Sequence, residues 1–155
     1  MSSPTNWMKS EYEDLVKKGF DWKPPVIGGP ATGRAIIDDK ERIMLCANNY
    51  LSMSNHPKVK QAAIDAVKSH GAGSGSVRPI AGNMDIHNEL EDTIARFKNR
   101  EAALYYQTGF AVNSGLIPQL TGKNDSIISD QLNHGSIIDG VRLSGVKKEN
   151  RTIYA

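Results

Sequence analysis

The sequence has no long apolar run and only one cysteine among its 155 residues. No stretch approaches the roughly 20 apolar residues that a helix needs to cross a bilayer, so we expect no membrane contact. The start of the chain, Met-Ser-Ser-Pro, lacks the apolar core of a secretory signal. The lone Cys46 excludes a disulfide framework within the chain and suits the cytoplasm. Because Cys46 stands in an apolar run, we expect a buried structural thiol there.

The sequence also lacks a strong surplus of one charge, and it contains no closely spaced pair of metal-binding residues. The chain has 19 basic and 17 acidic residues, which are interspersed and give a net charge of +2. The longest basic runs are doublets, which argues against nucleic acid as a partner. Without an H-x-x-x-H or C-x-x-C pair, we expect no metal site. A composition of 39% hydrophobic and 23% charged residues is typical of a globular domain with a core.

The first third of the sequence predicts a helix, an arm and a hairpin. Apolar residues on one face predict a helix over residues 5–18. Prolines and glycines predict an extended arm over 21–33, and short apolar runs at 34–37 and 42–46 predict a β-hairpin. We assign residues 1–52 to this N-terminal region. Residues 53–155 are expected to begin a larger α/β domain.

Helices and strands are expected to alternate in that larger domain. The predicted helices cover 57–69, 83–97, 110–120 and 134–143, and the predicted strands cover 102–107, 126–129 and the stretch from Arg151. This alternation predicts a largely parallel sheet covered by helices. Because the sequence stops inside the last predicted strand, we expect a longer protein or completion by another chain.

The turn Thr108-Gly109-Phe110 connects a predicted strand to a helix. The first amides of a helix are free, and the helix dipole favours an anion beside them. A bound phosphate is therefore one interpretation of this turn. The other is an ordinary loop in which Thr108 caps the helix, since α/β folds contain many such loops.

A second junction of the same kind follows the predicted strand 126–129. There Asn133 and His134 begin a helix at the strand end where α/β proteins bind ligands, although a single histidine more often has a capping or packing role. The glycine-rich segment 71–76 lacks the spacing and context of a dinucleotide-binding loop. With Ser76-Val77-Arg78 behind it, it is either a flexible connector or a loop that presents an arginine to an anion. A phosphate seat beside a histidine suits a phosphorylated cofactor with a flat ring.

The motifs together are similar to those of a known family, the α-oxoamine synthases, which are pyridoxal-phosphate enzymes of the aspartate-aminotransferase fold (fold type I). The resemblance runs from about residue 33 to the end. It rests on the stretches Cys46–Leu51, Ser76-Val77-Arg78 with Ile80 and Gly82, His87-x-x-Leu90-Glu91, Thr108–Phe110 and Ile128–Gly140. It implies a three-layer α/β fold with a mostly parallel sheet, present here in part, and pyridoxal 5'-phosphate as cofactor.

The resemblance also implies roles for particular residues. The amides of Gly109 and Phe110 would hold the cofactor phosphate, and His134 would stack on the pyridine ring near the substrate. Asn49 would lie close to the substrate. Ser76 and Arg78 would lie near an active site shared between the subunits of a homodimer, with a part in acyl-CoA binding.

The resemblance is greatest to members that condense glycine with acetyl-CoA, the glycine C-acetyltransferases (2-amino-3-ketobutyrate CoA ligases). One alternative is 8-amino-7-oxononanoate synthase, which uses alanine and pimeloyl-CoA. Another is a non-catalytic partner chain, because the family's cofactor-binding lysine, pyridine-nitrogen aspartate and carboxylate-binding arginine would all lie beyond residue 155. The chain departs from the family pattern at Ser52, Pro79 and Gly135, which puts the local geometry there in question.

Overall fold

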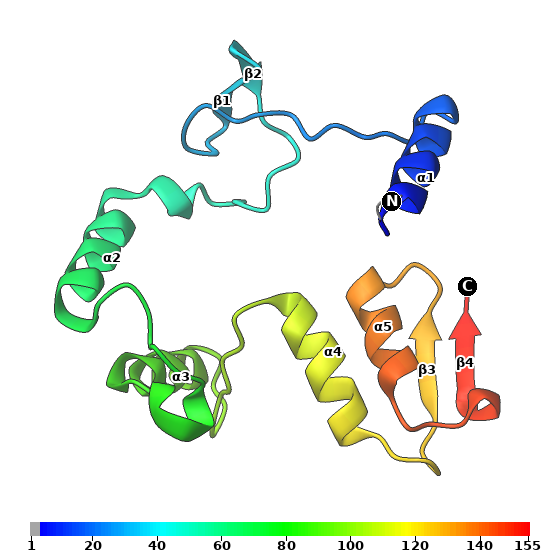
Figure 1. The fold of residues 1–155 in the computed structure, drawn as a ribbon. Helices are drawn as coiled ribbons and strands as arrows, with labels where there is room; N and C mark the ends of the chain where they lie inside the picture. Colours follow the sequence, from blue (N-terminus) through cyan, green and yellow to red (C-terminus); the bar gives the residue numbers. More distant parts are fainter. Residues whose placement is uncertain (1–3) are drawn as a thin grey trace. The chain divides into compact units, whose positions relative to one another are not determined.

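A computed structural model describes residues 4–155. They form two compact units, one that ends at Gly73 and one that spans Ser74–Ala155 (Figure 1). The domain boundary predicted between residues 52 and 53 concerns the complete protein. The division at Gly73 does not test it, so it stays a prediction. Across the described residues, no helix combines the length and apolar character that a membrane crossing requires.

The first unit has the predicted order of helix, arm, hairpin and helix. Its elements are α1 (Asn6–Lys17), β1 (Arg34–Ile37), β2 (Lys40–Ile43), a short 3-10 turn (Met53–Asn55) and α2 (Pro57–His70). The hairpin pairs Arg34 with Ile43 in antiparallel register. Pro57 occupies the first position of α2, where its missing N–H costs nothing. The side chain of His56 caps this helix by accepting a hydrogen bond from the Lys58 amide over 3.2 Å.

The prediction that Cys46 is a buried structural thiol is wrong. Cys46 is a free and exposed cysteine. Its neighbour Leu45 is 92% exposed and Ile43 is 66% exposed. An apolar run becomes buried only where another element covers it, and in the described residues β2 pairs with β1 alone.

The second unit contains a βαβ arrangement. Its elements are a π-helical turn (Arg78–Gly82), α3 (Asp85–Phe97), α4 (Gly109–Leu120), β3 (Ile127–Asp130), α5 (Gly135–Leu143), a 3-10 turn (Lys148–Asn150) and β4 (Arg151–Tyr154). Strands β3 and β4 pair in parallel, with Ile127 opposite Arg151, and α5 connects them (Figure 1). The predicted parallel pairing of these two segments is confirmed.

The strand predicted over residues 102–107 is absent. The segment runs in irregular conformation up to α4. Its backbone has a different partner, because the amide of Tyr105 donates to Oε1 of Glu91 over 2.8 Å. A strand needs a neighbouring strand as well as an apolar pattern, and none pairs with this segment among the described residues.

Helices α4 and α5 pack closely because one contact residue has no side chain. A methyl group at Gly140 would collide with the main-chain oxygen of Asn113 and would lie 2.9 Å from Cδ1 of Ile117. Gly140 and Ser136 of α5 are buried. The close approach of two helices brings the first turns of α4 and α5 into one neighbourhood.

Candidate functional site

The start of α4 leaves main-chain donors unused. Thr108 is extended, with φ −145° and ψ 153°, and its hydroxyl accepts a hydrogen bond from the Ala111 amide over 3.0 Å. The next amide, that of Val112, donates to the Thr108 carbonyl. Within residues 4–155, the amides of Gly109 and Phe110 have no hydrogen-bond acceptor. Two free N–H groups at the positive end of a helix dipole suit a phosphate group.

The start of α5 is organised around the side chain of His134. This residue is the N-cap of the helix, and its Nδ1 accepts a hydrogen bond from the Ser136 amide over 3.1 Å. The Ser136 hydroxyl lies 2.7 Å from the same nitrogen. Asn113 of α4 donates from Nδ2 to that hydroxyl over 3.0 Å. The structure thus joins His134 to the helix that begins at the Thr108 turn.

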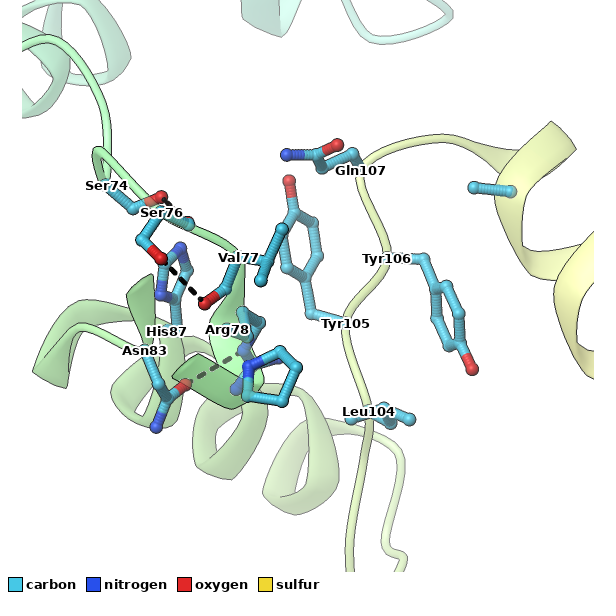
Figure 2. Close-up of a pocket in the computed structure, with 12 residues that line it drawn as sticks. Ser74, Ser76, Val77, Arg78, Asn83, His87, Leu104, Tyr105, Tyr106 and Gln107 are labelled. Carbon is cyan, nitrogen blue, oxygen red and sulfur yellow. Dashed lines mark hydrogen bonds between the residues drawn. The ribbon is translucent and has the colours of Figure 1, made fainter. Parts of the chain in front are cut away.

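Ser76 and Arg78 line a cavity of about 670 Å³ that reaches the flank of that turn. On the opposite side, Tyr105, Tyr106 and Gln107 come from the segment that precedes α4 (Figure 2). The π-helical turn after Ser76 requires Gly82, where a methyl group would collide with the carbonyl oxygen of Ser76. These two predicted residues therefore line one cavity together with Gln107 and Ala111, which stand on either side of the Thr108–Phe110 turn.

The guanidinium of Arg78 is already engaged by protein groups. Nη1 and Nη2 donate to the two carboxylate oxygens of Glu91 over 2.5 and 3.0 Å, and Nε donates to Oδ1 of Asn83 over 2.8 Å. The hydrogen bonds from Arg78 and from the Tyr105 amide lower the pKa of Glu91 to about 2. The hydrogen bond with Glu91 also raises the pKa of Arg78. The ion pair thus ties the Ser76–Asn83 segment to α3 and to the chain that leads into α4.

His87 has the structural role that its place in a helix suggests. Its Nδ1 accepts from the Met84 amide over 3.0 Å at the start of α3. Its ring stacks on Tyr105 with a centroid distance of 6.4 Å. His87 and Glu91 therefore both hold the segment that stands where a strand was expected.

Asn49, the remaining predicted site residue, belongs to the first unit. Its Nδ2 donates to the Ala31 carbonyl over 2.7 Å, and its Oδ1 accepts from the Ser54 amide over 3.1 Å. The side chain thereby fastens the arm to the turn before α2. A substrate contact by Asn49 stays a prediction.

Glu91, Ser136 and Asn113 have contacts in the structure that the sequence did not predict. Glu91 stands in the His87-x-x-Leu90-Glu91 stretch that supported the family resemblance, but nothing in the sequence pointed to Arg78 as its partner. No sequence pattern linked Ser136 with Asn113, because they are 23 residues apart and meet only through the packing of α4 on α5. No group of three or more His, Cys, Asp or Glu in the described part of the chain is placed to hold a metal ion.

Comparison with known proteins gives a consistent result. Residues 40–154 match the family described as aminotransferase class I and II. The 8-amino-7-oxononanoate synthase of Alkaliphilus metalliredigens is 49% identical over 142 residues, which are 92% of this chain and 36% of that protein. The chain thus spans about a third of the length of this curated relative. The relatives support the α-oxoamine synthase resemblance, but they favour the oxononanoate synthase alternative over glycine C-acetyltransferase.

Solved structures agree on the fold. A serine palmitoyltransferase variant from S. paucimobilis, with a bound PLP–myriocin aldimine, matches with a TM-score of 0.81 and 27% identity over 97% of this chain and 37% of its own. The 8-amino-7-oxononanoate synthase of Francisella tularensis matches with a TM-score of 0.58 and 30% identity over 70% of this chain and 29% of its own. The described residues hold part of the α/β fold of fold type I pyridoxal-phosphate transferases, as predicted. Pyridoxal 5'-phosphate is the cofactor of this fold, and the free amides of Gly109 and Phe110 fit its phosphate.

Proposed function

The chain belongs to the aminotransferase class I and II family, and we propose that it is the N-terminal part of an 8-amino-7-oxononanoate synthase. The full-length protein would condense alanine with pimeloyl-CoA, release CoA and act as a homodimer in the cytoplasm. The observation that carries the choice of substrates is the 49% identity to a protein of that name over 92% of the chain. The reaction class draws its structural support from the free amides at the start of α4.

In this proposal the residues of the chain bind and orient. The amides of Gly109 and Phe110 hold the cofactor phosphate at the positive end of α4. His134 lies against the face of the cofactor ring and aligns the reacting carbon. When bound, pyridoxal phosphate supplies an electron sink for charge that develops on that carbon. The residue that attaches the cofactor covalently would come from the part of the protein beyond Ala155.

Three further residues complete the proposed site. Asn49 lies near the substrate, and Ser76 faces the acyl-CoA at the active site shared between subunits. Arg78 contributes to acyl-CoA binding by fixing the segment that carries Ser76, because its guanidinium pairs with Glu91 and Asn83. Its charge is therefore largely compensated within the protein.

The test compares two substrate pairs on the full-length protein. Release of free CoA thiol is followed with alanine and pimeloyl-CoA and, separately, with glycine and acetyl-CoA, and kcat/KM is compared. We expect the first pair to be preferred and the purified protein to be yellow from bound cofactor. A preference for glycine and acetyl-CoA would restore the glycine C-acetyltransferase alternative. A colourless protein that releases CoA with neither pair would indicate a non-catalytic partner chain.

A further inference from the structure

We propose that Ser136 is a positioning residue that fixes the ring of His134 and keeps its proton on Nε2, and that Asn113 directs the Ser136 hydroxyl toward that ring. The proposal concerns one chain of hydrogen bonds between α4 and α5. Its consequence for catalysis rests on the proposed function. The position of the histidine proton does not depend on the proposed function, because it can be measured in a protein without any activity.

The tautomer follows from a donor that cannot change its role. The Ser136 amide donates to Nδ1 of His134 over 3.1 Å. A backbone N–H can only donate, so Nδ1 must present its lone pair. In a neutral imidazole the proton then resides on Nε2. This geometry needs no assumption about the direction of any hydroxyl.

The direction of the Ser136 hydroxyl follows in turn. Its oxygen lies 2.7 Å from Nδ1, and since Nδ1 accepts, the hydroxyl must donate. The oxygen still has lone pairs, and Asn113 donates to it from Nδ2 over 3.0 Å. Ser136 is 3% exposed, so water offers no ready substitute for either partner. A buried hydroxyl that loses its partners costs free energy, which makes this arrangement specific.

The packing of the two helices holds the chain of hydrogen bonds in place. Asn113 lies one helical turn beyond Gly109, and Ser136 lies in the first turn of α5. The missing side chain at Gly140 lets α5 approach the main chain at Asn113 closely. The orientation of the His134 ring is therefore fixed relative to the helix whose first amides are proposed to hold the cofactor phosphate.

The chemical result is a directed donor. His134 itself is exposed, while its Nδ1 edge is bound to Ser136. The Nε2–H group is thus the free polar edge of the ring, and it can donate to an oxygen of a bound substrate. A ring that changed tautomer would present an acceptor there instead, and a ring that rotated would move the donor away. Precise orientation is worth a large part of a catalytic effect.

The first experiment measures the tautomer. Full-length protein without cofactor is labelled with ¹⁵N-histidine, and the His134 resonances are assigned by their loss in His134→Ala. We expect Nδ1 to give the shift of an unprotonated nitrogen and Nε2 that of a protonated one. A protonated Nδ1 in the neutral ring would overturn the proposal. This readout decides about the hydrogen bonds even if the protein is inactive with every substrate pair.

The second experiment tests the positioning role in the holoenzyme. Ser136→Ala removes the hydroxyl but keeps the amide, and we expect kcat to fall roughly tenfold, the equivalent of one hydrogen bond, with KM values little changed. The His134 resonances should also broaden or shift. The matched control is Ser144→Ala, which removes another buried hydroxyl of the same region, one that donates to the Val141 carbonyl over 2.7 Å. Ser144→Ala should leave kcat unchanged.

A nearly isosteric variant guards against a folding defect in Ser136→Ala. Asn113→Asp replaces the donor with a carboxylate, which would take the hydroxyl proton of Ser136 away from His134. We expect a fall in kcat in the same direction, with an unfolding temperature close to that of the parent protein. Wild-type kcat in both Ser136→Ala and Asn113→Asp would overturn the positioning role. If the parent protein releases CoA with neither substrate pair, the proposed function fails, and the tautomer measurement alone decides this inference.

Discussion

The two helix starts of the second unit resemble each other in sequence pattern and differ in what they leave free. At α4 the short side chain of Thr108 caps the amide of Ala111, so the first two amides of the helix have no acceptor among the described residues. At α5 the longer side chain of His134 reaches the amide of Ser136, and the histidine itself is held by that contact. One start offers its main chain to a ligand, and the other offers a side chain that its main chain has fixed.

In the proposed site, the two N-caps would therefore serve in two different ways. A threonine cap stabilises the helix and leaves an anion seat beside it. A histidine cap uses its Nδ1 for the helix and leaves Nε2, which the proposed function assigns to the substrate side. The first unit contains a comparable histidine cap, since His56 accepts from the Lys58 amide at the start of α2. His56 is therefore a natural control for His134.

The largest expected effect comes from removing the histidine of α5. In the full-length protein, His134→Ala should lower kcat about 100-fold or more, because the cofactor ring and the reacting bond lose their alignment. Cofactor content, read from the absorbance of bound pyridoxal phosphate, should persist because the phosphate contacts remain. His56→Ala loses the same kind of cap, about 1 kcal/mol of stability, and should keep its kcat. Full turnover of His134→Ala would contradict the assigned role.

The next effect comes from removing one donor of α4. Gly109→Pro deletes a single N–H at the first helical position, where proline is well tolerated, and the extended Thr108 before it suits a proline. Affinity for pyridoxal phosphate should fall roughly tenfold or more, the value of a charge-assisted hydrogen bond. Gly109→Ala is the control, because it keeps the N–H and its methyl group meets nothing within 4 Å. Equal affinities for the two variants, measured by equilibrium titration, would remove the phosphate seat from this turn.

A smaller effect should follow from forcing the two helix starts apart. Gly140→Ala places a methyl group against the main chain of Asn113 and should lower the free energy of unfolding by about 1–2 kcal/mol. Gly115→Ala in α4 is the matched control, since nothing lies within 4 Å of its added methyl group and alanine favours a helix. Denaturant unfolding of the full-length variants measures both. A Gly140→Ala protein as stable as Gly115→Ala would show that α4 and α5 are not in close contact.

The smallest effect concerns the ion pair that anchors the approach to α4. The pKa of Glu91 is lowered from 4.5 to about 2, so its contribution to stability is complete above pH 4.5 and is lost as the pH falls toward 2. Glu91→Gln should therefore be less stable than the parent at neutral pH, and the difference should shrink over that range. Unfolding temperatures recorded from pH 7 to pH 2 give the comparison. The exposed Glu89→Gln on the same helix should follow the parent at each pH.

Sequence by itself determined the features that depend on neighbouring residues or on the order of the elements. The start of α2 at Pro57, the Thr108 cap, the bounds of α5 and the parallel partners β3 and β4 follow from periodicity, capping chemistry and alternation of elements. The motifs around these positions also predicted pyridoxal 5'-phosphate as the cofactor. Capping and periodicity act within a few residues, and the single helix between β3 and β4 makes them parallel neighbours, so the folded chain rarely changes these features.

Tertiary structure alone decided which distant groups meet. In the folded chain the Tyr105 amide donates to Glu91 and not to a neighbouring strand, and Cys46 is exposed. The charge of Arg78 is compensated by a carboxylate 13 residues away. It also placed Asn113 against Ser136, so that His134 is directed from a second helix. These contacts depend on how closely two elements approach each other, as at Gly140. A periodic sequence pattern indicates which face of an element is apolar, but it does not indicate which other element will pack against that face.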